Sequence, residues 1–268
     1  MIKAALHVHS TFSDGEFTLT ELREKFLRAG CRIVCMADHA DAFDDAKVAE
    51  YVRELASLSD ERLTFVPGLE FGCVQRMHIV GYGVTTLIDS DDPETVIAHI
   101  RRCEGIPVIA HPPDHLFPLI EGFGILPDGI EAWNSKYDGR YAPRPATFAL
   151  IERLQARSPS LKAFYGQDLH WRKQFAGLFN MLDIPLADRT SVLRALARGE
   201  FEGLFEGKER EIRLPSDAGL PANLVEEFAR ASARTMRFRN TVKSVRKTLG
   251  GALKLLPAPI KAQLRRFF

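Results

Sequence analysis

Short apolar segments rich in β-branched residues alternate with amphipathic helical patterns over most of this 268-residue chain. This alternation constrains the fold more than any other feature, because it is typical of parallel βα units that bury a sheet beneath helices. We therefore expect an α/β fold of the barrel-like kind. After a first strand near the N-terminus, the expected strands are Arg32–Ala37, Leu63–Phe71, Met77–Tyr82, Pro107–Ala110, Gly129–Trp133 and Ala163–Gly166.

Three helices have clear boundaries in the sequence. Thr18 and Glu21 have the spacing of a capping box, which predicts a helix that ends before Gly30. Two further amphipathic patterns predict helices over 44–58 and 93–102.

Residue types that bind metals lie in or after most of the expected strands. His7 and His9 are two residues apart, and strand side chains alternate between faces, so both imidazoles are expected on one face. Asp14 follows in a Ser-Asp-Gly turn that can fold it back over the end of the strand. Similar side chains recur later in the chain: His39, Glu70, His78, His111, Asp168 and His170.

In an α/β barrel, functional side chains gather at the C-terminal ends of strands that are far apart in sequence. We therefore expect the nine residues to form one metal site at that end of the fold. A mixture of imidazoles and a few carboxylates suits Zn, Mn or Fe, and nine ligands can serve two or three divalent ions. A single histidine near a strand is more often a core or surface residue, but six of the eight histidines follow this pattern.

The motifs that hold these residues resemble those of the PHP (polymerase and histidinol phosphatase) family in order and spacing. They read H-x-H-S-T-x-S-D-G, A-D-H, G-L-E, M-H-I-V-G-Y-G, A-H-P and G-x-D-x-H. The resemblance implies a distorted seven-stranded (βα) barrel with the metal site at the C-terminal ends of the strands, and hydrolysis of phosphate esters. It covers residues 1–175 as the barrel core. Residues 176–227 resemble the region that follows this domain in stand-alone members, which leaves 228–268 as a basic tail.

The resemblance also implies how the ligands are shared among the ions. One ion is expected on His7, His9, Glu70 and Asp168, a second on Glu70, His78 and His111, and a third on Asp14, His39 and His170. Glu70, Asp168 and His39 are the residues expected to act in catalysis. Two metals about 4 Å apart lower the pKa of a shared water, so the expected nucleophile is a bridging hydroxide.

Four further residues are candidates for contact with the substrate. Ser10 follows His9 and is placed to hydrogen-bond a metal ligand or a phosphate. Lys136, Arg140 and Arg144 lie on the loop expected after the strand Gly129–Trp133, where they can clamp a phosphate. Solvated loop charges are the alternative for these three basic residues.

Three functions are compatible with this pattern. The first is a phosphomonoesterase acting on a small phosphorylated metabolite or nucleotide. The second is a nuclease or cyclic-nucleotide phosphodiesterase, which shares the metal site but requires an open basic groove. The third is a non-catalytic adaptor that binds a membrane or RNA, which predicts missing ligands, whereas all nine positions are filled.

Charge is distributed unevenly along the chain. Eleven of the 36 Lys and Arg residues, and none of the 35 acidic residues, follow Glu227, so residues 1–227 carry a net charge of −10 and the tail +11. Within the tail, an apolar stripe alternates with basic residues, as in interfacial membrane helices. An anionic lipid surface is one expected partner, nucleic acid a second, and the acidic body of the chain itself a third. We expect a cytoplasmic protein that the tail can hold on the inner face of the membrane.

Overall fold

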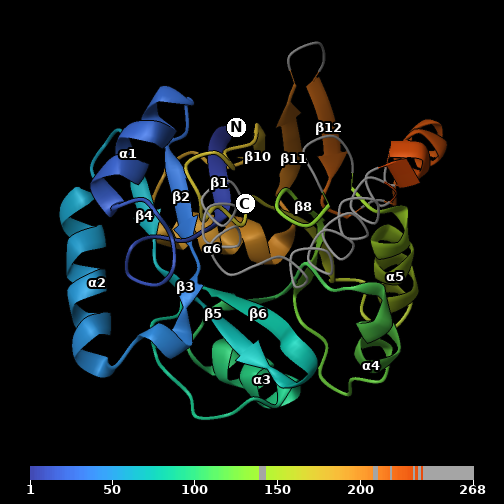
Figure 1. Cartoon of the computed structure of the whole chain (residues 1–268), viewed down its shortest axis with the longest axis horizontal. Coiled ribbons are helices and arrows are strands. Elements are labelled where there is room, and N and C mark those ends of the chain that lie inside the picture. The colour runs from blue at the N-terminus through green and yellow to red at the C-terminus, as the bar shows by residue number, and fades with distance from the viewer. Residues whose placement is uncertain (139–142, 208–210, 218, 232, 235–236, 238–268) are drawn as a thin grey trace, which may run out of the picture.

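The computed structural model describes residues 1–138, 143–207, 211–217, 219–231, 233–234 and 237, and it has a mixed α/β fold with two sheets of six strands (Figure 1). The expected α/β class is therefore confirmed. The first sheet has the order β12-β11-β10-β1-β2-β4 and the second the order β3-β5-β6-β7-β8-β9. The strands are β1 (Ile2–Val8), β2 (Ile33–Met36), β3 (Asp38–His39), β4 (Thr64–Val66), β5 (Gly68–Cys73), β6 (Met77–Tyr82), β7 (Ile106–Ala110), β8 (Gly129–Asn134), β9 (Lys162–Gly166), β10 (Leu178–Leu182), β11 (Phe201–Glu206) and β12 (Glu211–Pro215). The α-helices are α1 (Leu19–Arg28), α2 (Asp45–Leu58), α3 (Pro93–Arg102), α4 (Phe117–Glu121), α5 (Pro145–Gln155) and α6 (Arg189–Arg198).

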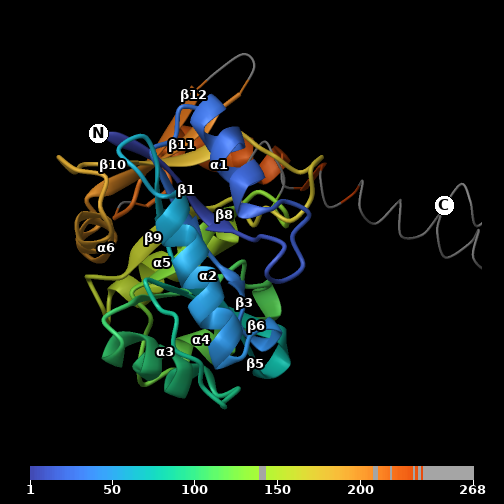
Figure 2. The same cartoon turned by 90° about the vertical axis from the view of Figure 1, so that its left-hand side faces the viewer.

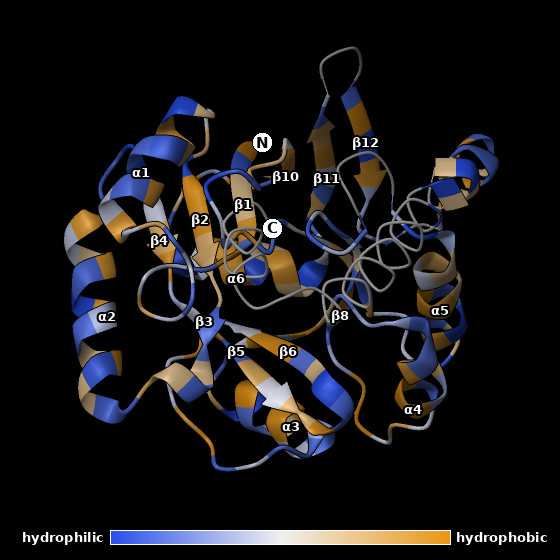
Figure 3. Cartoon of the chain, in the orientation of Figure 1, coloured by the Kyte–Doolittle hydropathy of each residue, from blue (hydrophilic) through white to orange (hydrophobic). Residues whose placement is uncertain are grey.

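The helices cover the sheets with the boundaries that their capping residues predict. Thr18 caps α1 with the complete capping box to Glu21, and Asp44 caps α2 by accepting from the backbone N–H of Lys47. Figure 2 shows α1 and α2 on one face of the molecule. In Figure 3, β2 has hydrophobic colours beside the mixed colours of these helices, as expected for a buried strand beneath amphipathic helices.

The second sheet departs from the expected parallel pattern. β5 pairs antiparallel with β6, and β6 antiparallel with β7, whereas β7, β8 and β9 are parallel. The expectation of parallel βα units is therefore wrong at β6. Only the short turn Val74–Arg76 joins β5 to β6, and a parallel crossover needs a much longer connection. As a result His78 lies near the start of its strand, where it pairs with Gly72, two residues from Glu70 along β5. Its Nδ1 atom lies 3.1 Å from Oε1 of Glu70.

The two sheets meet beside β1. Val8 forms a parallel bridge with Leu169, and the backbone N–H of His9 donates to the carbonyl of Leu169. On the other side, β2 of the first sheet leads after one residue into β3 of the second. These links bring strand ends from both sheets together, while closure into a seven-stranded barrel stays a prediction.

Residues 176–227 add to the first sheet. β10 pairs antiparallel with β1, and β11 and β12 extend the sheet outward from β10. Residues 222–231 are helical, and Phe228 is fully buried with its ring centroid 6.3 Å from that of Trp133. The expected basic tail thus begins with a core residue, and most of the tail lies outside the described residues, as does Arg140. None of the helices in the described part of the chain is long and apolar enough to span a membrane.

Candidate metal centre

The structure brings all nine candidate metal ligands together where the two sheets meet. They form four overlapping groups whose ligand atoms lie within 4.8 Å of one another. His7, His9, His39 and Glu70 each belong to two groups, so the nine residues form one continuous cluster. The predicted division among three ions stays a prediction. The groups are His9, Asp14, His39 and His170; His7, His9 and Asp168; His7, Glu70 and His111; and His39, Glu70 and His78.

Three of these residues have an unusual backbone conformation. His7, His111 and Asp168 have φ angles of 59°, 33° and 50°, in a region that residues other than glycine seldom adopt. At His7 the register between β1 and β2 shifts, so β1 is not a regular strand there. The expected alternation of faces is therefore an incomplete reason for the proximity of His7 and His9. Strained backbone of this kind often occurs at functional sites, where the surrounding fold maintains it.

Glu70 lies at the centre of the cluster. Its Oε1 atom is 3.1 Å from Nδ1 of His78 and 3.3 Å from Nε2 of His111. Its Oε2 atom is 3.1 Å from Nδ1 of His39 and 3.6 Å from Nε2 of His9. The two oxygens of a single buried carboxylate thus face different sets of histidines, which is the geometry that a bridging ligand requires.

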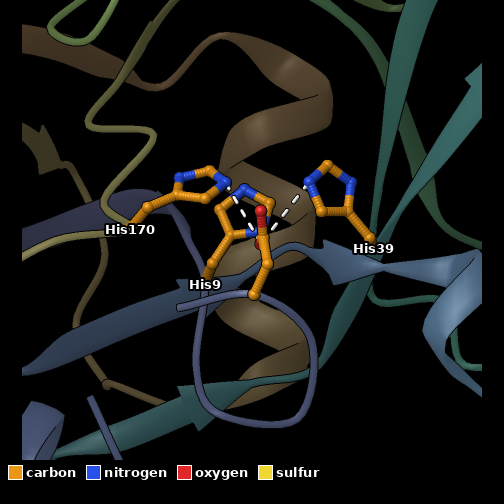
Figure 4. A group of neighbouring side chains, drawn as sticks. His9, His39 and His170 are labelled. Atoms are coloured by element: carbon orange, nitrogen blue, oxygen red, sulfur yellow. Dashed lines mark ion pairs between the residues drawn. The ribbon is translucent and has the colours of Figure 1, made fainter. Parts of the chain in front are cut away.

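Asp14 closes the outer side of the cluster. Its Oδ1 atom lies 3.2 Å from Nε2 of His170, 3.6 Å from Nε2 of His39 and 3.9 Å from Nδ1 of His9. The labelled imidazoles of His9, His39 and His170 converge in Figure 4, and dashed lines mark the ion pairs. Asp14 is more than half exposed, so this side of the cluster is open to solvent.

Charges in the cluster shift the pKa of its members in opposite directions. Burial opposes protonation of His7, but the carboxylates of Glu131, Glu70 and Asp168 outweigh it and hold the pKa of His7 well above its ordinary value. Burial and the neighbouring imidazoles hold the pKa of His9 well below its ordinary value. The carboxyl pKa values of Glu70 and Asp168 lie well below the ordinary range, because nearby histidines outweigh the effect of burial.

The buried nitrogen atoms of the cluster test whether metal ions fit it. Nε2 of His7 and both ring nitrogens of His9 are buried and have no hydrogen-bond partner. Buried polar atoms without a partner are costly and rare in folded proteins. A divalent cation would satisfy these nitrogens, and the neighbouring carboxylates would offset its charge. The residues present therefore fit metal ions.

Glu131 supports the cluster from behind, and the sequence analysis missed it. Its fully buried carboxylate lies 2.7 Å from Nδ1 of His7 and accepts hydrogen bonds from the backbone N–H of His111 and the side chain of Asn134. A Cβ atom at Gly166 would collide with this carboxylate, so glycine leaves the space that Glu131 occupies. A charged residue inside the apolar strand Gly129–Asn134 is the signal that could have found it.

Asp38 holds the loop between His9 and Asp14. Its fully buried carboxylate accepts hydrogen bonds from the backbone N–H and hydroxyl of Ser10 and from the hydroxyl of Ser13. Ser10 is itself fully buried, and its hydroxyl donates to Asp38. This geometry favours a role for Ser10 in fixing the loop. It does not favour the expected contact between Ser10 and a phosphate.

The structure places two of the basic residues predicted to clamp a phosphate, Lys136 and Arg144, in different surroundings. Nζ of Lys136 lies 3.1 Å from Oδ1 of Asp168 and 3.2 Å from both ring nitrogens of His170, so Lys136 belongs to the cluster. The guanidinium of Arg144 instead donates to Asp138, Asp114 and the carbonyl of Pro112. Arg144 therefore ties two loops together, and these contacts do not favour its expected role in binding phosphate.

Comparisons with known proteins find one family model that matches part of the sequence. The family model described as PHP domain matches residues 5–119, a range that includes seven of the nine clustered residues. Asp168 and His170 lie beyond the match. No curated protein matches the chain.

Two solved structures share the fold. One is a two-domain protein from Bacteroides vulgatus ATCC 8482, described as containing a predicted PHP-like metal-dependent phosphoesterase, with a TM-score of 0.53 and 15% identity over 76% of this chain. This chain spans 65% of the length of that protein. The other is PsfC from Pseudomonas syringae PB-5123, with a TM-score of 0.51 and 14% identity over 77% of this chain and 92% of PsfC. At these identities the likeness extends to the fold alone.

Proposed function

Because the PHP domain family model matches residues 5–119, we propose that the chain is a metal-dependent phosphoesterase, a hydrolase that breaks phosphoester bonds. The observation that carries this proposal is the cluster of nine histidines and carboxylates, in which buried imidazole nitrogens face carboxylate oxygens without a hydrogen-bond partner. A cluster of this composition is costly to bury without cations. Divalent ions of Mn, Zn or Fe are the proposed cofactors.

The residues of the chain would divide the work as follows. The nine clustered residues would hold the ions, with Glu70 between two of them. When bound, the ions would polarise the phosphoryl group, neutralise charge on the leaving oxygen and favour attack by water. Glu131 would fix the ring of His7, because its carboxylate binds the nitrogen that faces away from the cluster. Lys136 would bind a phosphoryl oxygen through its ammonium group.

We further propose that the substrate is a small phosphomonoester. Among the Lys and Arg residues that the structure describes, Lys136 is the one that forms an ion pair with a member of the cluster, Asp168. One ammonium suits a single phosphate, whereas nucleic-acid backbones are followed by grooves with several basic side chains.

A nuclease or cyclic-nucleotide phosphodiesterase is the second candidate. The rings of Trp171 and Tyr137 are both exposed, and their centroids lie 5.4 Å and 5.3 Å from Nζ of Lys136. Exposed aromatic rings beside a phosphate-binding group can stack on nucleobases. This observation favours a nucleotide-containing substrate.

The test is an assay of the chelated protein after addition of Mn, Zn or Mg. Phosphomonoesters, cyclic nucleotides and short RNA are compared as substrates at equal metal concentrations. Metal-dependent release of inorganic phosphate supports the first function, and cleavage of RNA or cyclic nucleotides without release of phosphate supports the second. Full activity in the presence of chelator, or no hydrolysis of any ester with any metal, contradicts the proposal.

A further inference from the structure

A cavity of about 780 Å³ opens directly beside the candidate metal centre. Asp14, His39 and His78 form part of its wall, so a molecule in the cavity would touch the cluster. A cavity of this size is in the range of small-molecule sites. It is therefore the natural place for the part of a phosphate ester that lies beyond the phosphoryl group.

One part of the cavity wall is apolar. Its lining includes Phe43, Leu87 and Ile88, and also Phe71, whose ring packs against that of His99. Phe71 is almost fully buried, and the other three are half-buried. Burying apolar surface of a ligand against these side chains is favourable, at about 25 cal/mol per Å².

The charged part of the wall is acidic. Besides Asp14, the cavity is lined by Asp41 and Asp89, which are both exposed and have no ion-pair partner in the described part of the chain. None of the described residues that line the cavity is Lys or Arg. A second anionic group in this space would meet the carboxylates of Asp41 and Asp89. The ammonium of Lys47 donates to the carbonyl of Ala42, a lining residue, and so offsets part of this negative charge.

Resting on the proposed function, we propose that this cavity binds the alcohol part of the phosphate ester. It selects alcohols that have an apolar body and carry either no charge or a positive charge. It discriminates against esters whose alcohol part bears a second phosphate or a carboxylate. The phosphoryl group remains at the cluster, where Lys136 and the bound cations offset its charge. The alcohol part would face Asp41 and Asp89, and no Lys or Arg is among the described lining residues.

The test uses three aryl phosphates that differ mainly in the charge of one group attached through a para methylene. They are para-ethylphenyl, para-aminomethylphenyl and para-carboxymethylphenyl phosphate, in which the methylene group insulates the leaving oxygen from the charge. At low ionic strength, kcat/KM is expected to be at least about fivefold lower for the carboxymethyl ester than for the other two, with the difference mainly in KM. Added salt should reduce the difference.

The matched variants remove two negative charges in different places. The double variant Asp41→Asn and Asp89→Asn should bring the three esters to nearly equal kcat/KM. The control variant Glu50→Gln and Asp183→Asn removes two exposed acidic groups outside the cavity and should leave the preference unchanged.

Failure of this inference differs from failure of the proposed function. Hydrolysis of all three esters with equal kcat/KM overturns the inference and leaves the phosphoesterase proposal standing. If none of the three esters is hydrolysed with any of the metals, the proposed phosphomonoesterase activity fails, and calorimetric titration with the same esters then measures the order of affinity directly. Equal affinity for the anionic and cationic esters, or an equal change of preference in both double variants, also overturns the inference.

Discussion

Nδ1 of His7 lies 2.7 Å from Oε1 of Glu131, and both side chains are fully shielded from solvent. This contact fixes the orientation of an imidazole whose other nitrogen faces Glu70 and Asp168. Since the second carboxylate oxygen of Glu131 binds the backbone N–H of His111, one side chain positions two members of the cluster. Such supporting carboxylates tune metal affinity without touching the metal.

Replacement Glu131→Gln is therefore expected to weaken metal binding by about 10- to 100-fold. The amide keeps the size of the side chain but offers one acceptor where the carboxylate offers two. Affinity is measured by competition with a chelator, and metal content by emission spectroscopy. Replacement of the exposed residue Glu50 by Gln serves as the control, and equal affinities of the two variants would show that Glu131 does not position the cluster.

Glu70→Gln is expected to be the most damaging single replacement in the cluster. A neutral amide cannot bridge two cations as an anion, so both metal content and hydrolysis should fall, while the helical circular-dichroism signal is kept. His99→Gln is the matched control, because His99 is a mostly buried histidine outside the cluster that pairs with the carbonyl of Thr86. Loss of metal in the control and not in Glu70→Gln would refute the bridging role.

Metal affinity is expected to rise with pH. In the metal-free protein the pKa of His7 lies well above its ordinary value, and a proton on Nε2 of His7 must leave before that atom can bind a metal. Affinity should therefore increase until the pH exceeds this raised pKa. Calorimetric titrations in buffers of different ionisation enthalpy measure the protons released on binding. A constant affinity between about pH 6 and pH 9, with no proton release, contradicts this account.

The same shifts predict how the stability of the metal-free protein depends on pH. The ion pairs of protonated His7 contribute stability below its unfolded pKa of about 6.5, and this contribution is lost as pH rises through the raised folded pKa. Glu70 and Asp168 have depressed pKa values, so their contribution is present above the ordinary carboxyl pKa and is lost on acidification. Denaturant unfolding with chelator should show both losses, and a flat profile would contradict them.

Particular residues show which features of the fold were readable from the sequence. Local signals, such as the capping box at Thr18 and the amphipathic pattern over 93–102, depend on residues close together in the sequence and gave correct helix boundaries. The expected strand Leu63–Phe71 is instead split at Pro67 into β4 and β5, which belong to different sheets. The pairing of β10 with β1 depends on contacts between residues about 180 positions apart, which no local pattern encodes.

The residues of the candidate site could be predicted from the sequence more completely than the pairing of the strands. Histidines and carboxylates in ordered motifs predicted the membership of the cluster, because each residue type has few other reasons to recur at strand ends. Positive φ angles at His7, His111 and Asp168 were not predictable, since residues other than glycine seldom adopt them. The roles of Arg144 and Ser10 were not predictable either, because both depend on acidic partners that only the fold brings close, Asp114 and Asp38.

The basic tail is expected to recruit the protein to anionic surfaces without taking part in hydrolysis. Because Phe228 is buried, a truncation should follow residue 237, which keeps the described helical segment and removes eight of the eleven basic residues. The truncated protein should hydrolyse a soluble ester at close to the full-length rate and lose sedimentation with anionic vesicles. If the full-length protein ignores these vesicles but binds RNA with a steep salt dependence, nucleic acid is the partner instead.

Asp38 is expected to determine the stability of the loop that carries Asp14. Replacement Asp38→Ala leaves the buried N–H and hydroxyl of Ser10 and the half-buried hydroxyl of Ser13 without their acceptor. Each of the two buried donors costs about 1–3 kcal/mol when it has no partner. The free energy of unfolding should therefore fall by about 3 kcal/mol or more in the presence of chelator. Asp38→Asn should be milder, since its amide oxygen still accepts and burial already raises the pKa of the Asp38 carboxyl. Equal destabilisation by both variants would mean that the carboxylate charge, and not the hydrogen bonds to Ser10 and Ser13, holds the loop.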